Sequence, residues 1–332
     1  MWRLFIPPFV VSLLTFTAVL WFGGVAALSL AFFLTILEVS LSFDNAVINA
    51  KILARMEEKW RRRFLTWGML IAVFGTRLVL PVLIVSAATL TSPLSIAFFL
   101  FGDPGAYSRL IESVSPSIHA FGGAFLLMVA LRYFFDEAKS VHWIRFVERR
   151  LSKWGQVEAI EVLFTLVLLL IVAWMVPQSA LMILAAGALG IVLFILIEGA
   201  VHILGASAGS VAREGMALFV YLNLLDAAFS LDGVIGAFAL TSQILIIIAG
   251  LGIGAYFVRA LTIFFVRRRT LATLVYLEHG AYWAICALAF CMFINIATPV
   301  PNAFVGTISI LFIGAAYLSS LRESRLREPD AA

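Results

Sequence analysis

The stretch Glu38–Ala46 reads EVSLSFDNA and places two carboxylates, Glu38 and Asp44, inside an otherwise apolar segment. The preceding run, Ala26–Leu37, contains no charged residue. An ionised carboxylate at the centre of a bilayer costs about 3 kcal/mol, so such residues usually face a bundle interior or a water-filled cavity and carry a function. The two acids are therefore the first candidates for a functional site.

The same pattern returns at Asp226–Gly233, which reads DAAFSLDG. When Ser42 is aligned with Ser230, Asp226 falls on Glu38 and Asp232 falls on Asp44. Both second acids follow a serine by two residues. One acid in an apolar segment could reflect packing alone, but the repeated acid-x5-Asp spacing indicates an internal duplication.

The composition is that of a membrane protein. The chain has 332 residues, of which 63% are hydrophobic and only 13% charged, against about 25% charged in soluble domains. Lipid offers the backbone no hydrogen bonds, and the apolar runs are long and continuous, so we expect an all-α, polytopic transmembrane helix bundle rather than a barrel. The net charge of +4 reflects basic loops beside apolar runs and does not indicate nucleic-acid binding.

We expect about ten membrane helices. They divide into an N-terminal helix over residues 1–24, a first three-helix repeat over 25–136, a basic loop with two helices over 137–215, a second three-helix repeat over 216–298, and a last helix with a basic tail over 299–332. Gly23 and Gly24 make the first turn. The basic runs near residues 51–63, 139–153, 267–269 and 322–327 all fall on one side, which predicts that this side and both termini are cytoplasmic.

Two regions have less decisive patterns. The segment Thr89–Pro116 has no basic cluster and is expected to be an external loop, with His119 near the interface at the start of the next helix. Glu198 and His202 are four residues apart on one face of a helix, a spacing that suits a metal ion or a proton relay. They could equally lie near the cytoplasmic interface.

The two motifs lie on helices of opposite predicted orientation, which indicates an inverted repeat. Gly68 precedes Arg77 by nine residues and Gly250 precedes Arg259 by nine, each in the helix after a motif. Inverted repeats with ion sites near the midplane are typical of secondary transporters.

The six-residue spacing between the two acids of each motif indicates whether they can share one face of a helix. Six residues of helix rotate by about 600°, so Glu38 and Asp44 do not share a face of an ideal helix. Either they face different neighbours or the helix is broken between them. Unwound backbone near Ser42 and Ser230 would expose carbonyl oxygens beside the acids, and Asn45 and Gly233 are weak helix formers.

The charges suggest a cation. Glu38, Asp44, Asp226 and Asp232 exceed the expected counterions, Arg77 and Arg259, by two negative charges, which one divalent cation would neutralise. Carboxylate, hydroxyl, amide and carbonyl oxygens are ligands suited to Mn²⁺, Mg²⁺ or Ca²⁺. Proton coupling is an equally natural use of the surplus acids. A pair of structural salt bridges with the arginines would also account for the charges.

The two motifs resemble the signature motifs of the TerC-like integral membrane proteins, which belong to the wider LysE-like transporter superfamily. The family takes its name from tellurite-resistance operons, and the resemblance implies manganese efflux or supply of metal to exported enzymes. It places Asp44, Asn45 and Asp232 on the family's core positions and Glu38 and Asp226 on the preceding acids. Gly233 departs from the serine that many members have there.

These observations predict a secondary transporter of the bacterial inner membrane that exports a divalent cation, with Mn²⁺ favoured. The alternatives are an exporter of amino acids or other small solutes, and a non-transporting scaffold that handles metal with partner proteins. The sequence shows no phosphate-binding loop, HExxH motif or nucleophile–base pair, so we expect neither an enzyme nor an organic cofactor. The expected partners are the lipid bilayer and the ion; the oligomeric state stays open.

Overall fold

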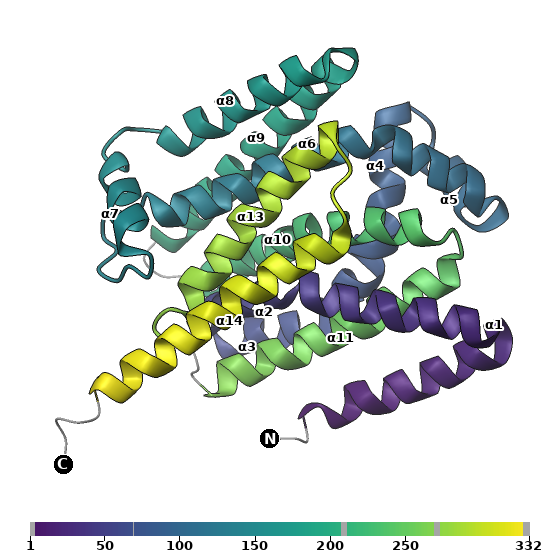
Figure 1. Cartoon of the computed structure of the whole chain (residues 1–332), viewed down its shortest axis with the longest axis horizontal. Coiled ribbons are helices and arrows are strands. Elements are labelled where there is room, and N and C mark those ends of the chain that lie inside the picture. The colour runs from purple at the N-terminus through teal and green to yellow at the C-terminus, as the bar shows by residue number, and fades with distance from the viewer. Residues whose placement is uncertain (1–3, 69, 207–210, 269–272, 328–332) are drawn as a thin grey trace.

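The computed structural model describes residues 4–68, 70–206, 211–268 and 273–327, and the regular secondary structure of these ranges is entirely helical. Figure 1 shows the helices packed into one bundle, with the C-terminal helix lying diagonally across it. The predicted all-α class is confirmed. Arg269, at the end of the third basic run, lies outside the described residues.

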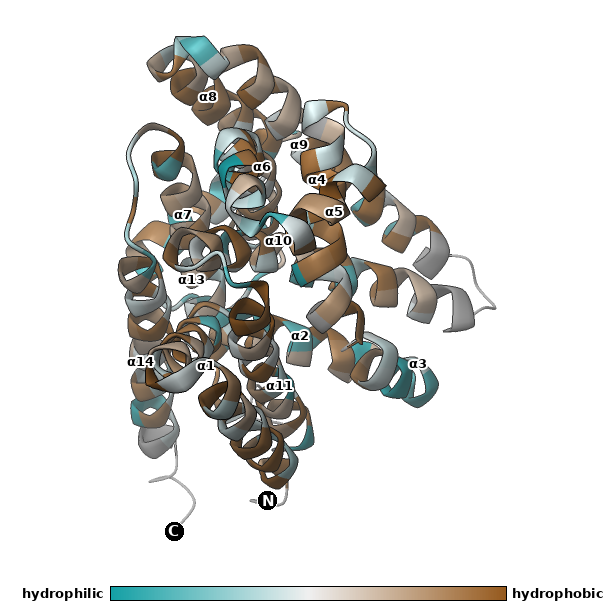
Figure 2. Cartoon of the chain, turned by 90° about the vertical axis from the view of Figure 1, so that its right-hand side faces the viewer, coloured by the Kyte–Doolittle hydropathy of each residue, from teal (hydrophilic) through white to brown (hydrophobic). Residues whose placement is uncertain are grey.

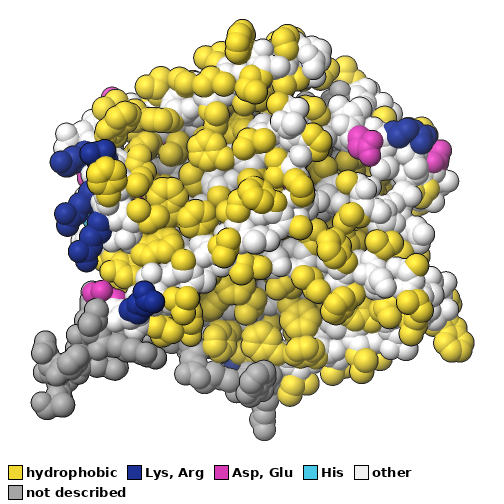
Figure 3. Space-filling model, viewed as in Figure 1, with side chains coloured by type: hydrophobic (Ala, Val, Ile, Leu, Met, Phe, Trp, Pro, Cys, Tyr) yellow, Lys and Arg dark blue, Asp and Glu magenta, His cyan; other side chains and the backbone are white. Residues whose placement is uncertain are grey.

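Seven helices are long and apolar enough to cross a membrane. They are α1 (Ile6–Leu41), α6 (Pro104–Phe134), α9 (Ala180–Ala206), α10 (Val211–Leu240), α11 (Ile244–Arg268), α13 (Leu277–Ala297) and α14 (Asn302–Arg327). Hydrophobic side chains cover the middle of the face shown in Figure 3, whereas charged ones gather at its left and right ends. The chain is therefore a multi-pass membrane protein.

The expected ten crossings are not all present as long helices. α1 consists of two helical halves joined at a kink, which account for two of the expected crossings. Two other apolar segments, Phe74–Ala87 and Ile160–Met175 (α8), are shorter than the 18 residues of a long span. A 16-residue helix is about 24 Å long, less than the roughly 30 Å hydrocarbon core. The two helices expected within residues 137–215 are present as α8 and α9, which are joined by a short turn at Pro177–Ser179.

The first turn lies at Gly24, as the sequence predicts. Its φ of 73° and ψ of −172° fall in a region that is almost exclusive to glycine. The chain reverses there, so that the two halves of α1 form a hairpin (Figure 1) with the Phe16 and Phe32 rings 6.0 Å apart. Only the backbone demands glycine, because no other atom lies within 4 Å of the place that a Cβ would occupy.

We expect Gly24→Ala to lower the free energy of unfolding by about 1–3 kcal/mol, since alanine must adopt this strained conformation. Gly199→Ala is the matched control: Gly199 lies inside α9 with equally open space around it, and alanine should stabilise that helix by about 0.5–1 kcal/mol. Thermal unfolding of both variants in detergent measures the difference. Equal effects of the two substitutions would contradict the assignment of the turn.

The segment after the first motif changes helix type several times. α2 (Phe43–Arg55) is followed by α3 (Glu58–Arg63), then by π-helical turns at η2 (Phe64–Gly68) and η3 (Ile71–Val79), and by α4 (Leu80–Thr89). The predicted third helix therefore exists, but part of it is wound as π-helix. Such π-turns occur frequently at functional sites.

The expected external loop at Thr89–Pro116 is wrong. It is largely helical, because Ser92 caps α5 (Pro93–Gly102) and Asp103 caps α6, each followed by a proline in the first turn. α6 therefore begins well before its predicted start and continues through Pro116. His119 is consequently buried inside the bundle instead of lying at an interface.

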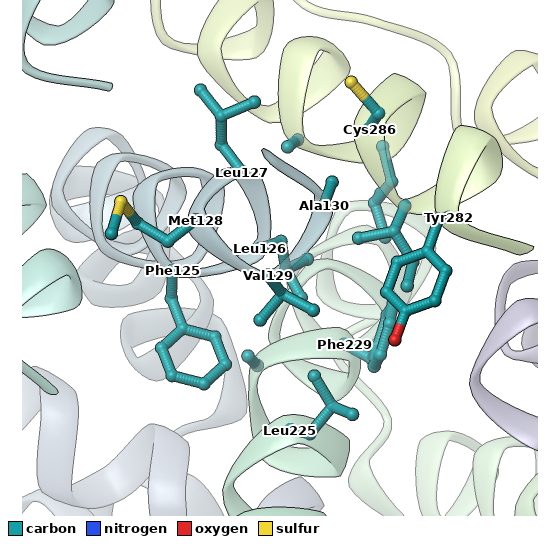
Figure 4. Close-up of a cluster of buried hydrophobic side chains, with 14 of the residues drawn as sticks. Phe125, Leu126, Leu127, Met128, Val129, Ala130, Leu225, Phe229, Tyr282 and Cys286 are labelled. Atoms are coloured by element: carbon teal, nitrogen blue, oxygen red, sulfur yellow. The ribbon is translucent and has the colours of Figure 1, made fainter. Parts of the chain in front are cut away.

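The core forms where α6, α10 and α13 meet. Figure 4 shows Phe125 and Val129 of α6, Leu225 and Phe229 of α10 and Tyr282 of α13 in one apolar cluster. Glycine brings the helices close: a Cβ at Gly122 would lie 2.6 Å from the terminal methyl group of Met292. In Figure 2 the ribbons of α1 and α11 are largely brown, and many of the large apolar side chains of α1 are exposed.

The short helix α7 (Arg145–Trp154) is anchored by a buried acid, Glu148. Its carboxylate accepts hydrogen bonds from Lys139 Nζ at 3.0 Å and from Trp283 Nε1 at 3.1 Å, and lies 2.9 Å from His279 Nδ1. Burial alone would raise the pKa of Glu148, but the hydrogen bonds from His279 and Lys139 outweigh it and hold the pKa well below the ordinary value of 4.5.

We expect Glu148→Gln to destabilise the protein by about 3–5 kcal/mol at neutral pH, because it leaves the buried Lys139 without its carboxylate. A depressed pKa contributes stability above the unfolded-state value that is lost as the pH falls. The difference in melting temperature between wild type and variant should therefore narrow below about pH 4.5. Glu137→Gln, on an exposed neighbour, is the control and should show little effect at any pH. A difference in melting temperature that stays constant with pH would refute a stabilising role of the ionised Glu148 carboxylate.

Candidate functional site

The first motif contains a helix break at Ser42, one of the two arrangements that the sequence left open. Ser42 has φ −101° and ψ 13°, which ends α1 and lets α2 start at Phe43. In the second motif α10 runs through Ser230 without a break, so the expected unwinding there is absent. The Ser230 hydroxyl accepts a hydrogen bond from the Thr76 hydroxyl at 3.3 Å. The two motifs therefore match in sequence but differ in backbone.

Glu38 lies on the last turn of α1 and forms an ion pair with Arg77 of η3. The Ser42 hydroxyl donates to the same carboxylate at 2.9 Å. Both charged side chains are at most 5% exposed. Gly254 of α11 makes room for the acid, because a Cβ there would lie 2.5 Å from the Glu38 Cβ. Arg77 thus serves as the counterion that the sequence predicts.

Asp226 joins the second motif to the first. Its carboxylate accepts a hydrogen bond from the Asn45 side-chain amide, which links α10 to α2. Asp226 and Glu38 line the same cavity of about 40 Å³. A cavity needs about 10–15 Å³ to hold one water molecule, so this one accommodates an ion with a few waters. The remaining lining includes Arg77, Ser42, Asn49 and Arg259, with apolar residues of η2 and α11.

Asp44 and Asp232 lie outside this cavity lining. Asp44 is fully buried, and its Oδ1 accepts from the Asn45 amide N–H at 2.8 Å. Asp232 Oδ1 lies 3.4 Å from His119 Nε2, and His119 Nδ1 lies 3.1 Å from the Ser115 hydroxyl. The second oxygen of each aspartate has no hydrogen-bond partner among the described residues.

The structure therefore corrects the expectation of a single four-acid site. Within the described part of the chain, no group of three or more His, Cys, Asp or Glu side chains is arranged to hold a metal ion. The reason is the helix rotation between residues 38 and 44, which sends Glu38 to the cavity and Asp44 to another neighbour. Two of the acids line the cavity, and the other two are absent from its lining.

Arg259 was expected to balance the acids. It lines the cavity, but its guanidinium donates to the Leu65 carbonyl of η2 and makes no ion pair within the described residues. A π-helical turn shifts the hydrogen-bond register from i−4 to i−5, which leaves carbonyls available to partners outside the helix. Only one of the two predicted counterions thus contacts an acid.

The predicted secondary pair, Glu198 and His202, is not assembled into a site. Arg132 Nε donates to Glu198 at 2.6 Å, and Arg132 Nη1 lies 3.5 Å from Glu161, so that Glu198 already has a cationic partner. The His202 side chain is exposed. Glu198 lines a larger cavity of about 530 Å³ that also contains Lys51 and Tyr133.

Several polar residues near the acids were missed by sequence reasoning: Asn49, Thr76, His119 and Asn295. A signal was available for each, since each is a polar side chain within an otherwise apolar predicted helix. Asn49 in addition follows Asn45 by four residues and so shares its helix face.

Comparison with known protein families gives one match. A family described as a protein of unknown function, DUF475, matches residues 43–327. The chain belongs to the DUF475 family. The match includes Asp44, Asp226 and Asp232, whereas Glu38 lies just before it. Searches of curated proteins and of solved structures give no match.

We expect Glu38→Gln to lower stability by about 3–5 kcal/mol, because Arg77 then stays buried without this carboxylate. Replacing both partners, as Glu38→Gln with Arg77→Met, should recover part of the loss, since the uncompensated charge is removed as well. Thermal unfolding of the two single variants and the double variant measures the coupling. Glu112→Gln, on an exposed position of α6, is the control. If the stability loss of the double variant equals the sum of the losses of the two single variants, the two side chains do not form a buried ion pair.

Proposed function

We propose that this membrane protein is a secondary transporter that exports a divalent metal cation, with Mn²⁺ as the first candidate, across the bacterial inner membrane. The observation that carries the proposal is the shared cavity: Glu38 from the first motif and Asp226 from the second line one small cavity. Carboxylates that line a cavity inside a membrane bundle mark ion pathways.

The cavity's chemistry favours a hard cation over an organic solute. Its polar lining consists of carboxylate, hydroxyl and amide oxygens together with two arginines, and oxygen donors suit Mn²⁺, Mg²⁺ and Ca²⁺. A volume of about 40 Å³ leaves no room for an amino acid in this conformation. The preference for Mn²⁺ rests on the resemblance to the TerC-like proteins.

The packing of the helices supports an inverted repeat. The helices that carry the first motif, α1 and α2, pack on α11, while α10, which carries the second, packs on η3. α6 and α13 pack on each other. If a two-fold axis relates residues 25–136 to 216–298, the packing of α1 and α2 on α11 is equivalent to the packing of α10 on η3. The same axis relates α6 to α13, so their mutual contact is symmetric. Alternating access would then rock one repeat against the other.

The ion pair between Glu38 and Arg77 suggests how binding is coupled to movement. A cation that binds Glu38 and Asp226 must replace Arg77 at Glu38, which separates α1 from η3. Asp44, Asp232 and His119 are buried in the bundle outside the cavity lining and would supply protonatable groups for exchange against protons. In this scheme Arg77 holds the ion-free site closed.

The basic loops support an orientation of the protein in the membrane. α7 lies at the left end of the view in Figure 3, where Lys and Arg side chains gather, and the chain leaves the bundle at the same end. The positive-inside rule would place that end in the cytoplasm. Uptake of Mn²⁺ into everted membrane vesicles would thus correspond to export from the cell.

We expect Asp226→Asn to reduce Mn²⁺ uptake by everted vesicles to the level of vesicles without the protein, because the cavity loses one of its two carboxylates. Asp103→Asn is the matched control, since Asp103 is an exposed cap of α6, and it should transport normally. The purified wild type should be stabilised against heating by Mn²⁺ and not by lysine. Stabilisation by lysine alone would favour the amino-acid exporter, and normal uptake by the Asp226 variant would refute the site.

A further inference from the structure

A second cavity, of about 270 Å³, lies beside α7 and is separate from the ion cavity. It is lined by Ser140, Val141, His142, Arg145, Arg149, Tyr276 and Glu323. Apart from Val141 and Glu323, every one of these side chains can donate a hydrogen bond. The lining is therefore rich in cationic and hydroxyl donors, which suits an anionic ligand.

Arg145 and Arg149 share this cavity with one carboxylate, that of Glu323, so that cations outnumber acids in its lining. Arg145 and Arg149 are four residues apart and share a face of α7, and neither forms an ion pair within the described residues. Glu148, which stands between them in the sequence, is buried against Lys139 and His279 and so is already neutralised. Paired guanidinium groups match the oxygens of a phosphate.

His142 can donate a further hydrogen bond from the lining of this cavity. Its ring lies 3.8 Å from Glu148, and Lys139 and Arg149 are its nearby cations. Burial first, and then the charges of Lys139 and Arg149, lower the pKa of His142. A lowered pKa favours the neutral imidazole, which still offers one ring N–H to a bound anion.

The position of α7 points to the bilayer as the source of the anion. Phe146 is 69% exposed and Trp154 is 51% exposed, next to the cations of the same helix. Arg150 lies over the Phe146 ring at 4.1 Å. Exposed aromatic residues among arginines are typical of helices that lie in the membrane interface. Tyr276 directly precedes α13 and Glu323 lies near the end of α14, so the cavity sits where membrane helices end.

We propose that this cavity binds the phosphate of an anionic phospholipid, with Arg145 and Arg149 as its main ligands and His142, Ser140 and Tyr276 as further donors. Basic pockets at the ends of membrane helices recognise such headgroups. α7 is tied to α13 through the hydrogen bonds of Glu148 with His279 and Trp283. A bound lipid would therefore stabilise the junction between α7 and α13.

The test compares ligands on the full chain, purified in a neutral detergent. Phosphatidylglycerol should raise the melting temperature, whereas phosphatidylcholine and inorganic phosphate at equal concentration should change it little. Native mass spectrometry then measures phosphatidylglycerol binding directly. Stabilisation by inorganic phosphate to the same extent would overturn the lipid assignment and indicate a site for free anions.

Substitutions distinguish lipid binding in this cavity from a general attraction of anionic lipid to the positive charge of α7. Arg145→Gln with Arg149→Gln should weaken phosphatidylglycerol binding by about tenfold or more, since the pocket loses both guanidinium groups. Arg150→Gln with Lys153→Gln removes the same charge from the same helix outside the cavity lining and should change binding less than about threefold. If the double pocket variant does not fold, Arg145→Gln against Arg150→Gln gives the same comparison. Equal losses for pocket and control would overturn the proposal.

Discussion

The buried ion pair between Glu38 and Arg77 is the constraint on which the arrangement of this protein depends. Neither charge could stay ionised in a lipid-facing position, so each helix that carries one must turn it toward the other. The pair holds α1 against η3. Gly254 allows α11 to approach the same acid, and α1 ends at Ser42, whose hydroxyl donates to that acid. The cavity beside this junction is a consequence of the three contacts.

The four motif acids have different surroundings although their sequences match. Glu38 and Asp226 face the cavity, with a guanidinium and an amide as their respective partners. Asp232 lies beside His119, and Asp44 is held by a backbone N–H. The four acids are therefore not equivalent in their contacts, although the duplicated sequence places them at matching positions.

α7 shows how a short basic helix can be held at a membrane surface. Its acid, Glu148, is directed inward and satisfied by residues of the loop and of α13, whereas its arginines and aromatic residues remain outside. The helix is thereby fixed to the bundle by buried polar contacts and is left free to interact with the interface by its other face. Arg145 and Arg149 of this helix line the cavity beside it.

The sequence by itself determined the membrane class, most of the helices and the duplicated motifs, because hydropathy, glycine turns and residue spacing are local properties. The turn at Gly24 and the contact of Arg77 with an acid belong to this part. Only the tertiary structure decided that Arg259 bonds to the Leu65 carbonyl, that His119 meets Asp232, and that two acids instead of four face the cavity. These features depend on π-turns, on helix rotation and on the cap at Asp103, and the partners concerned are far apart in the chain.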